Sequence, residues 1–175
     1  YLMGKEPFPF DLLFWNADST RMPAVMHSYY LRNMYQENAL ARPGGLELGG
    51  VKIDLSKIKV PVYILSTKED HIAPWKSTYK ATQLYSGRTK FVLASSGHIA
   101  GVINPPASNR YSYRTNIKKS ATPEEWLDTA KEHGGSWWPD WDRWVRKHAG
   151  GEVKARDPGK VMTKAIEDAP GSYVL

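Results

Sequence analysis

The sequence predicts an α/β fold built on a parallel sheet with flanking helices. Two apolar runs, Val60–Thr67 and Thr89–Ala94, have the length and composition of strands that are covered on both faces. Between them lies a helical segment that begins at Pro74 and ends before Gly87. This strand–helix–strand order makes the two strands parallel members of one sheet.

The composition is that of an ordinary globular protein. The chain has 175 residues, of which 41% are hydrophobic and 24% charged, and this excludes disordered and collagen-like classes. No apolar run approaches the ~20 residues that cross a bilayer, so we expect no membrane span. The net charge of +6 suits an anionic partner, but Lys and Arg are scattered and no nucleic-acid-binding motif accompanies them. We therefore expect no nucleic-acid partner.

Upstream of the first strand, the sequence predicts a helix and then a hairpin. Pro23 suits a first helical position, and apolar residues at 26, 30 and 34 follow on one helix face up to about Leu40. Apolar and polar residues then alternate over 46–53 on either side of Gly49-Gly50, which predicts a two-residue hairpin. No Gly-Lys-Ser/Thr follows these glycines, so they do not form a phosphate-binding loop.

Two further helices and a tail are expected downstream of the second strand. The segment Thr122-Pro-Glu-Glu125 is a capping box and predicts a helix that runs from Pro123 to His133. Another helix begins at Pro139, with an apolar stripe at 141, 144, 145 and 148. Five of the seven tryptophans lie between residues 126 and 144, which favours a helix pair packed on the sheet over an aromatic ligand site. The polar composition from residue 150 onward predicts a tail.

Two loops of the predicted sheet contain residues suited to acid–base chemistry. The loop after the first strand contains Asp70 and His71, and the loop after the second contains Gly97 and His98. Open α/β sheets bind ligands at the carboxyl ends of their strands. An acid followed in the chain by a histidine is the order found in α/β-hydrolase triads, in which the carboxylate fixes the imidazole tautomer and the ring takes the nucleophile's proton. Gly97 is expected to allow a sharp backbone turn before His98.

Each of these residues also has an ordinary structural interpretation. Asp70 suits a turn or a helix start, given the nearby Pro74, and each histidine alone suits a loop. A metal site made of Asp70, His71 and His98 lacks a HExxH or other ligand spacing, so we expect no metal. The acid–histidine pair is the stronger hypothesis because chain order and position in the sheet agree.

Several long segments, which include both loops, are similar to one enzyme family. They are Pro9-Phe-Asp-Leu-Leu-Phe-Trp-Asn16, Ser66-Thr-Lys-Glu-Asp-His-Ile-Ala-Pro-Trp75, Ser96-Gly-His-Ile-Ala-Gly-Val-Ile-Asn-Pro-Pro106, Gly135-Ser-Trp-Trp-Pro-Asp-Trp141 and the closing Ala-Pro-Gly-Ser-Tyr-Val. On these segments the chain resembles, essentially end to end, the carboxyl-terminal third of class I polyhydroxyalkanoate (poly-3-hydroxybutyrate) synthases. Those enzymes polymerise 3-hydroxyacyl-CoA thioesters and release CoA.

The resemblance implies an architecture. It implies the carboxyl-terminal portion of an α/β-hydrolase core together with part of a helical cap. Residues 1–58 would then belong to the cap, residues 59–149 to the core that carries the acid and histidine loops, and residues 150–175 to a carboxyl-terminal tail.

The resemblance also implies residue roles. Asp70 matches the family's catalytic aspartate and His98 its catalytic histidine, which would deprotonate a cysteine nucleophile. Asp70 would either orient His98 or help to deprotonate the 3-hydroxyl of the incoming unit. His71 receives no catalytic role, and we expect Asp18 to be structural because acids commonly form turns.

The chain departs from the family pattern at the nucleophile. The family's cysteine lies in a Gly-x-Cys-x-Gly elbow, whereas this chain has no cysteine and no Gly-x-Ser-x-Gly. Ser66, Ser95 and Ser96 lie on the acid and histidine loops rather than on a strand-to-helix elbow. We therefore expect a carboxyl-terminal fragment that is inactive alone, with the cysteine outside this chain.

The implied substrate is a short-chain (R)-3-hydroxyacyl-CoA such as 3-hydroxybutyryl-CoA, joined to a growing polyester chain. No cofactor is expected, because the CoA thioester is itself the substrate. The resemblance further implies a homodimer in the cytoplasm at the surface of polyester granules. Two alternatives stay open: an esterase, thioesterase or polyester depolymerase that transfers the acyl group to water, and a non-catalytic module that contacts granules or partners through aromatic and basic surface.

Overall fold

The structure is a computed structural model that describes residue 4 and residues 21–157, 165–168 and 171–172. Asp18 and the segment 9–16, which is similar to the family, lie outside these residues, so the structural role expected for Asp18 stays a prediction. No helix within the described ranges is both long and apolar enough to cross a membrane.

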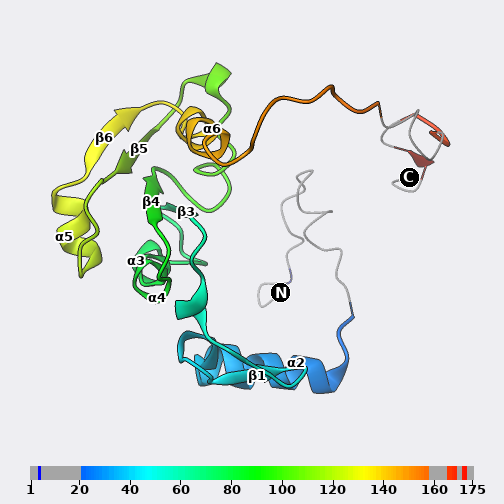
Figure 1. Cartoon of the computed structure of the whole chain (residues 1–175). Helices are drawn as coiled ribbons and strands as arrows, with labels where there is room; N and C mark the ends of the chain where they lie inside the picture. Colours follow the sequence, from blue (N-terminus) through cyan, green and yellow to red (C-terminus); the bar gives the residue numbers. More distant parts are fainter. Residues whose placement is uncertain (1–3, 5–20, 158–164, 169–170, 173–175) are drawn as a thin grey trace.

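Four strands, in the order β3-β4-β5-β6, form the main sheet (Figure 1). β3 (Val62–Thr67) and β4 (Thr89–Ala94) are the two expected strands, and they are parallel over six residue pairs. β5 (Ser112–Thr115) and β6 (Lys131–Gly134) continue the sheet in antiparallel fashion. The sheet is therefore mixed, and the predicted parallel arrangement holds for its β3–β4 half.

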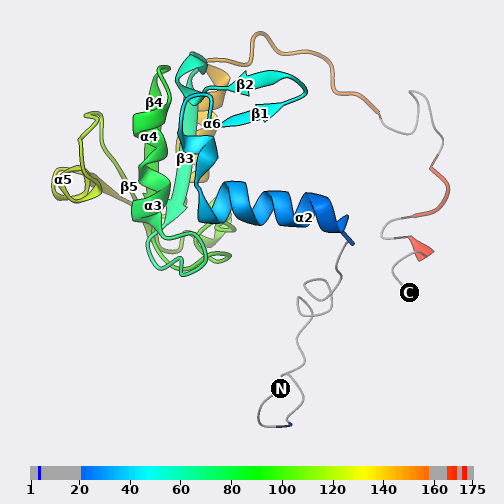
Figure 2. The same cartoon turned by 90° about the horizontal axis from the view of Figure 1, so that it is seen from below.

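Helices α3 (Trp75–Tyr79), α4 (Ala81–Leu84) and α5 (Pro123–Asp128) cover one face of this sheet. Figure 2 shows α3 and α4 on the opposite side of β3 from α6. Alternate strand residues share a face, so Phe91 and Leu93 of β4 both point toward α3. They pack there with Trp75, Tyr79 and Trp126. The single helix predicted over 74–84 is thus two short helices that meet at residue 80.

Helix α6 (Trp138–Arg146) lies on the other face. Val92 and Ala94 point to that side and pack with Trp137, the residue before the helix. Trp126 and Trp137 therefore pack on the sheet as expected, but they do so from opposite faces, and Trp141 is exposed. The interpretation of the two segments as a helix pair is wrong, because α5 and α6 pack on opposite faces of the sheet.

The helix predicted over residues 123–133 is wrong in its second half, where β6 takes its place. Its predicted start is present, because Thr122 Oγ1 accepts the backbone N–H of Glu125 at 3.2 Å. The later residues pair with β5 instead, and the His133 ring stacks on Tyr113 with centroids 4.9 Å apart. The residues of β6 carry no strand pattern of their own, because they are stabilised by pairing with β5, a strand that lies well outside a local sequence window.

The upstream elements match the prediction in kind. α2 (Ala24–Tyr30) starts directly after Pro23 and continues as the helical turn Leu31–Gln36. β1 (Leu46–Leu48) and β2 (Val51–Ile53) form the predicted antiparallel hairpin. The α2 helix and the β1–β2 hairpin lie beside the main sheet rather than within it (Figures 1 and 2). Within residues 21–157 there are also three short 3₁₀ turns: Ala39–Ala41, Leu55–Lys57 and Pro106–Ser108.

Candidate active site

Asp70 lies in the loop between β3 and α3. Its Oδ1 accepts the backbone N–H groups of Ile72 and Ala73 at 2.9 and 2.8 Å, the local turn that a short acidic side chain favours. Its Oδ2 is 3.4 Å from the Thr67 hydroxyl. The carboxylate is therefore held rigidly by its own loop, and its side chain is only 8% exposed.

His98 lies in the loop after β4 and contacts Asp70. Its Nδ1 is 2.7 Å from Asp70 Oδ2. The two loops meet because β3 and β4 are parallel, so their carboxyl ends lie at the same edge of the sheet. The expected proximity of this acid and this histidine is confirmed.

The environment of Asp70 keeps its carboxylate charged. The N–H of Ala73 contributes most to lowering its pKa to about 2, with further help from His98 and Ile72, and together they outweigh burial, which acts in the opposite direction. A charged carboxylate can only accept hydrogen bonds. Nδ1 of His98 must therefore carry the proton in the 2.7 Å bond.

That tautomer leaves Nε2 of neutral His98 as a hydrogen-bond acceptor. Across the described part of the chain, Nε2 has no hydrogen-bond partner, and the His98 side chain is 46% exposed. A carboxylate that orients a histidine with one accessible basic nitrogen can take a proton from a thiol or hydroxyl and then stabilise the resulting imidazolium. The pair is thus equipped for general-base chemistry.

The sharp turn before His98 is not made by Gly97. Ser96 has the left-handed conformation, with φ of 72°, and a Cβ at position 97 would meet no heavy atom closer than 4.0 Å. The glycine that the loop requires is Gly101, where a Cβ would lie 2.5 Å from Thr67 Cγ2 and 2.6 Å from the Ser95 carbonyl oxygen. Sequence reasoning missed it because the requirement comes from packing against β3.

The other candidates stay outside this pair. His71 is exposed and makes no hydrogen bond or ion pair with any described residue. Ser66 is buried within β3, and the Ser95 hydroxyl bonds to the Ser112 hydroxyl at 2.8 Å. The described ranges contain no group of three or more His, Asp or Glu side chains that could hold a metal ion.

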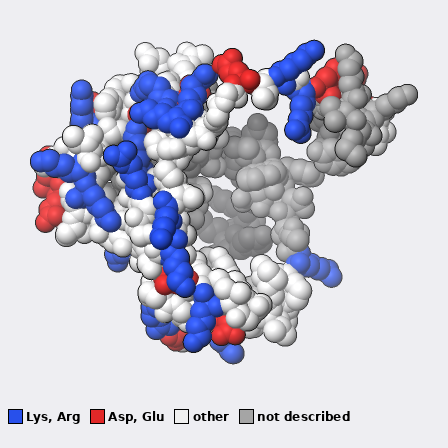
Figure 3. Space-filling model, viewed as in Figure 1, with Lys and Arg blue, Asp and Glu red and all other residues white. Residues whose placement is uncertain are grey.

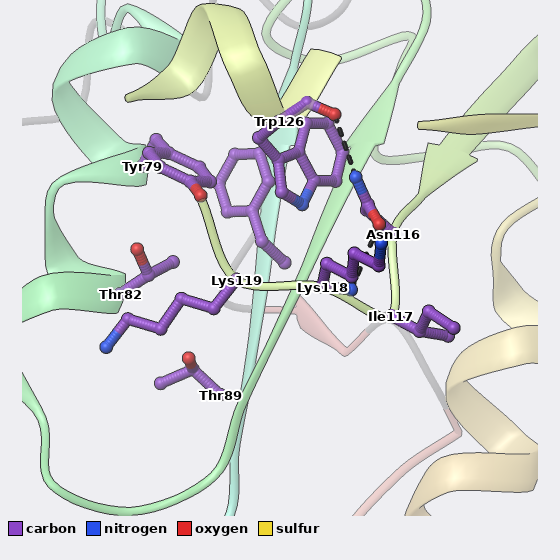
Figure 4. A pocket seen from close by; sticks show the side chains of 9 residues that line it. Tyr79, Thr82, Thr89, Asn116, Ile117, Lys118, Lys119 and Trp126 are labelled. Carbon is purple, nitrogen blue, oxygen red and sulfur yellow. Dashed lines mark hydrogen bonds between the residues drawn. The ribbon is translucent and has the colours of Figure 1, made fainter. Parts of the chain in front are cut away.

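A small pocket lies at the opposite end of β4 (Figure 4). It is lined by Thr89, the first residue of that strand, and by the rings of Tyr79 and Trp126. Lys118 and Lys119 line it as well. Its nine lining residues include no histidine and no carboxylate, whereas Asp70 and His98 lie at the other end of the strand.

On the face shown in Figure 3, charge does not indicate where an anionic ligand would bind. Figure 3 shows Lys and Arg side chains spread over the visible face with acidic side chains among them, rather than gathered in one patch. The scattered basic residues of the sequence are therefore scattered on this face as well.

The chain is similar to curated proteins over its whole length. It is 51% identical over 175 residues to the poly(3-hydroxyalkanoate) polymerase subunit PhaC of Rhizobium etli, which covers 100% of this chain and 27% of the relative. It is 50% identical over 175 residues to the subunit of the same name from Cupriavidus necator, covering 99% and 30%. Poly(3-hydroxyalkanoate) polymerase 2 of Ectopseudomonas oleovorans is 43% identical over 176 residues, covering 100% and 31%. No family model matches. The chain thus spans less than a third of the length of these relatives.

Proposed function

We propose, since the chain belongs to the poly(3-hydroxyalkanoate) polymerase family, that it supplies the acid and the histidine of an acyltransferase active site. The reaction is polymerisation of (R)-3-hydroxyacyl-CoA, such as 3-hydroxybutyryl-CoA, into polyhydroxyalkanoate with release of CoA. The observation that carries the proposal is the 2.7 Å hydrogen bond between Asp70 and His98 in a chain about half identical to named polymerases. The class I resemblance favours short acyl chains.

In the proposed mechanism, His98 Nε2 takes the proton of a cysteine thiol that lies outside this chain. The thiolate attacks the thioester carbonyl carbon, the carbon–sulfur bond to CoA breaks, and the acyl group is left on the cysteine. The imidazolium returns its proton to the departing CoA sulfur. The 3-hydroxyl of the next unit then attacks the carbonyl carbon of the acyl-cysteine while His98 takes the hydroxyl proton. The carbon–sulfur bond to the cysteine breaks, and the departing cysteine thiolate recovers the proton from His98.

Asp70 orients His98 and stabilises the imidazolium. Both of its oxygens already accept hydrogen bonds, and its pKa of about 2 makes it a weak base, which argues against direct deprotonation of the substrate hydroxyl. This choice between two roles cannot be made from the sequence alone, because either role requires an acid at the same place.

The proposed architecture is the carboxyl-terminal portion of an α/β-hydrolase core. Residues 59–149 form this portion, residues 1–58 belong to a cap and residues 150–175 form a tail. The parallel β3–β4 pair with an acid and a histidine on successive loops supports this assignment. The polymerase acts as a homodimer in the cytoplasm, at the surface of polyester granules, and this chain alone is inactive because it contains no cysteine.

The test uses the full-length protein that contains this chain. Incubation with (R)-3-hydroxybutyryl-CoA should release CoA and yield recoverable polymer. His98→Ala should lower the rate by about 10²–10⁴-fold, the usual contribution of a general base. His71→Ala, an exposed neighbour without a proposed role, is the matched control.

Two outcomes would overturn the proposal. Release of soluble 3-hydroxybutyrate without polymer would indicate a thioesterase or depolymerase that uses the same acid–histidine pair. Unchanged function in His98→Ala would favour the non-catalytic module.

A further inference from the structure

Two tryptophan side chains bind the loop that carries His98. The indole Nε1–H of Trp137 donates to the carbonyl oxygens of Gly101 and Val102, each at 3.2 Å. The Nε1–H of Trp138 donates to the Val102 oxygen at 2.9 Å. Both donors are therefore used on one short stretch of backbone.

This stretch connects directly to the residues beside His98. The N–H of Gly101 donates to the Gly97 oxygen at 2.9 Å, and the N–H of Val102 donates to the Ile99 oxygen at 3.0 Å. The backbone from 97 to 102 is thus a single hydrogen-bonded turn with His98 inside it. Holding the far end of the turn fixes the direction in which the His98 side chain leaves the backbone.

The donors themselves have fixed positions. Trp137 packs on the sheet beside Tyr63, with ring centroids 6.3 Å apart. Three positions later, within α6, Asp140 accepts the Tyr63 hydroxyl at 2.9 Å and pairs with Lys90 Nζ at 2.6 Å. Tyr63 and Lys90 lie opposite each other on β3 and β4. The start of α6 is therefore tied to the same strands that carry the two site loops.

His98 depends on its backbone for its position. Its side chain is 46% exposed and makes a single hydrogen bond to described residues, the one to Asp70. Because the His98 side chain has few contacts of its own, a shift of the turn would move the imidazole ring as well. Since a misplacement of about 1 Å can cost roughly 10²-fold in rate, a loop that carries a general base benefits from a support outside the loop.

We propose that Trp137 and Trp138 are positioning residues, which hold His98 against Asp70 by binding the Gly101 and Val102 carbonyl groups. The inference rests on the proposed function, because the position of His98 matters for activity only if His98 is the general base. Neither tryptophan touches substrate in this account, and both act through the turn.

The test replaces the indoles by phenyl rings in the full-length protein. Trp137→Phe/Trp138→Phe removes the N–H donors and keeps an aromatic ring at each site. Trp141→Phe is the matched control, because Trp141 lies in α6, as Trp138 does, and its indole makes no hydrogen bond to any described residue. Each single variant is made as well, so that poor folding of the double variant does not decide the result.

Two readouts are expected to change together. For CoA release from (R)-3-hydroxybutyryl-CoA, kcat of the double variant should fall by about 10–100-fold, while KM stays near that of Trp141→Phe. Amide hydrogen exchange measured by mass spectrometry should be faster over residues 97–103 than in the wild type or in Trp141→Phe. A role confined to stability would instead raise exchange across the whole domain.

The outcomes separate this inference from the proposed function. A wild-type protein that releases no CoA refutes the proposed function, and exchange over 97–103 then still shows whether the indoles hold the turn. An unchanged kcat in the double variant overturns the positioning role whatever the exchange rates are. A lower kcat without faster exchange over 97–103 overturns it too, because the effect would then not pass through the turn.

Discussion

Replacing Asp70 by Asn should remove most of the activity while leaving the loop in place. Oδ1 of Asp70 accepts the N–H groups of Ile72 and Ala73 at 2.9 and 2.8 Å, and an amide oxygen can accept both. The amide nitrogen then faces His98 Nδ1 and can only donate to it. The imidazole proton must move to Nε2, which removes the acceptor that would take the thiol proton.

The opposite amide orientation does not restore the site. It would place the amide nitrogen against two backbone N–H donors and lose both of the bonds that hold the loop. The same carboxylate-to-amide change in a serine protease triad lowers kcat by about 10⁴-fold, or about 5.5 kcal/mol of transition-state stabilisation. We expect a loss of about 10³–10⁴-fold in kcat with little change in KM.

The assay is CoA release from (R)-3-hydroxybutyryl-CoA by the full-length protein, followed with a thiol reagent. Glu69→Gln is the matched control, because Glu69 is the exposed preceding residue and its carboxylate makes no hydrogen bond or ion pair within the described ranges. An Asp70→Asn protein that keeps more than about a tenth of the wild-type kcat, a loss of under about 1.4 kcal/mol, refutes the reasoning.

Three further predictions concern stability and packing. Gly101→Ala places a Cβ 2.5 Å from a methyl carbon of β3, so overpacking should destabilise the fold by about 1–3 kcal/mol and lower the unfolding midpoint, and displacement of the turn that carries His98 should lower kcat. Gly134→Ala, whose Cβ meets nothing within 4 Å, should change neither, and equal effects of the two variants would contradict this. Asp140→Asn removes the largely buried charged partner of Lys90, 2.6 Å away, and should lower the free energy of unfolding by about 1.5–3 kcal/mol. Asp142→Asn, in an exposed pair with Arg146, should lower it by about 0.5 kcal/mol, and equal thermal unfolding midpoints of the two variants would contradict this. The pKa of Asp70 is lowered to about 2, so its stabilising contribution is complete above the ordinary value of 3.8 and is lost as pH falls toward 2. The difference in midpoint between wild type and Asp70→Asn should therefore shrink from about pH 4 to about pH 2, and a difference that is constant with pH would contradict the assignment.

The sequence predicts the centre of the fold well, because its two parallel strands are continuous apolar runs. The edge of the sheet is different. β6 has the sequence Lys131-Glu-His-Gly134, which carries no apolar alternation, and it is held as a strand by its ladder with β5 and by the Arg114–Glu132 ion pair at 2.7 Å. Such stabilisation comes from residues distant in the chain, so a local pattern that favours a helix gives the wrong result there.

The same division applies to the candidate site. The proximity of Asp70 and His98 follows from topology, since successive loops of parallel strands meet at one sheet edge. The need for Gly101 and the three indole hydrogen bonds could not be predicted, because nothing in a sequence says which glycine faces a neighbouring strand or which carbonyl an indole will meet. Tertiary packing decides both.

The most direct measurement is a single-turnover experiment on the full-length protein, in which (R)-3-hydroxybutyryl-CoA is mixed with excess enzyme and the peptides are analysed by mass spectrometry. The wild type should carry a 3-hydroxybutyryl thioester on one cysteine within the time in which CoA appears, and His98→Ala should form it about 10²–10⁴-fold more slowly. Equal rates of acylation in the two proteins would show that the imidazole at position 98 does not activate the thiol, and would contradict the account.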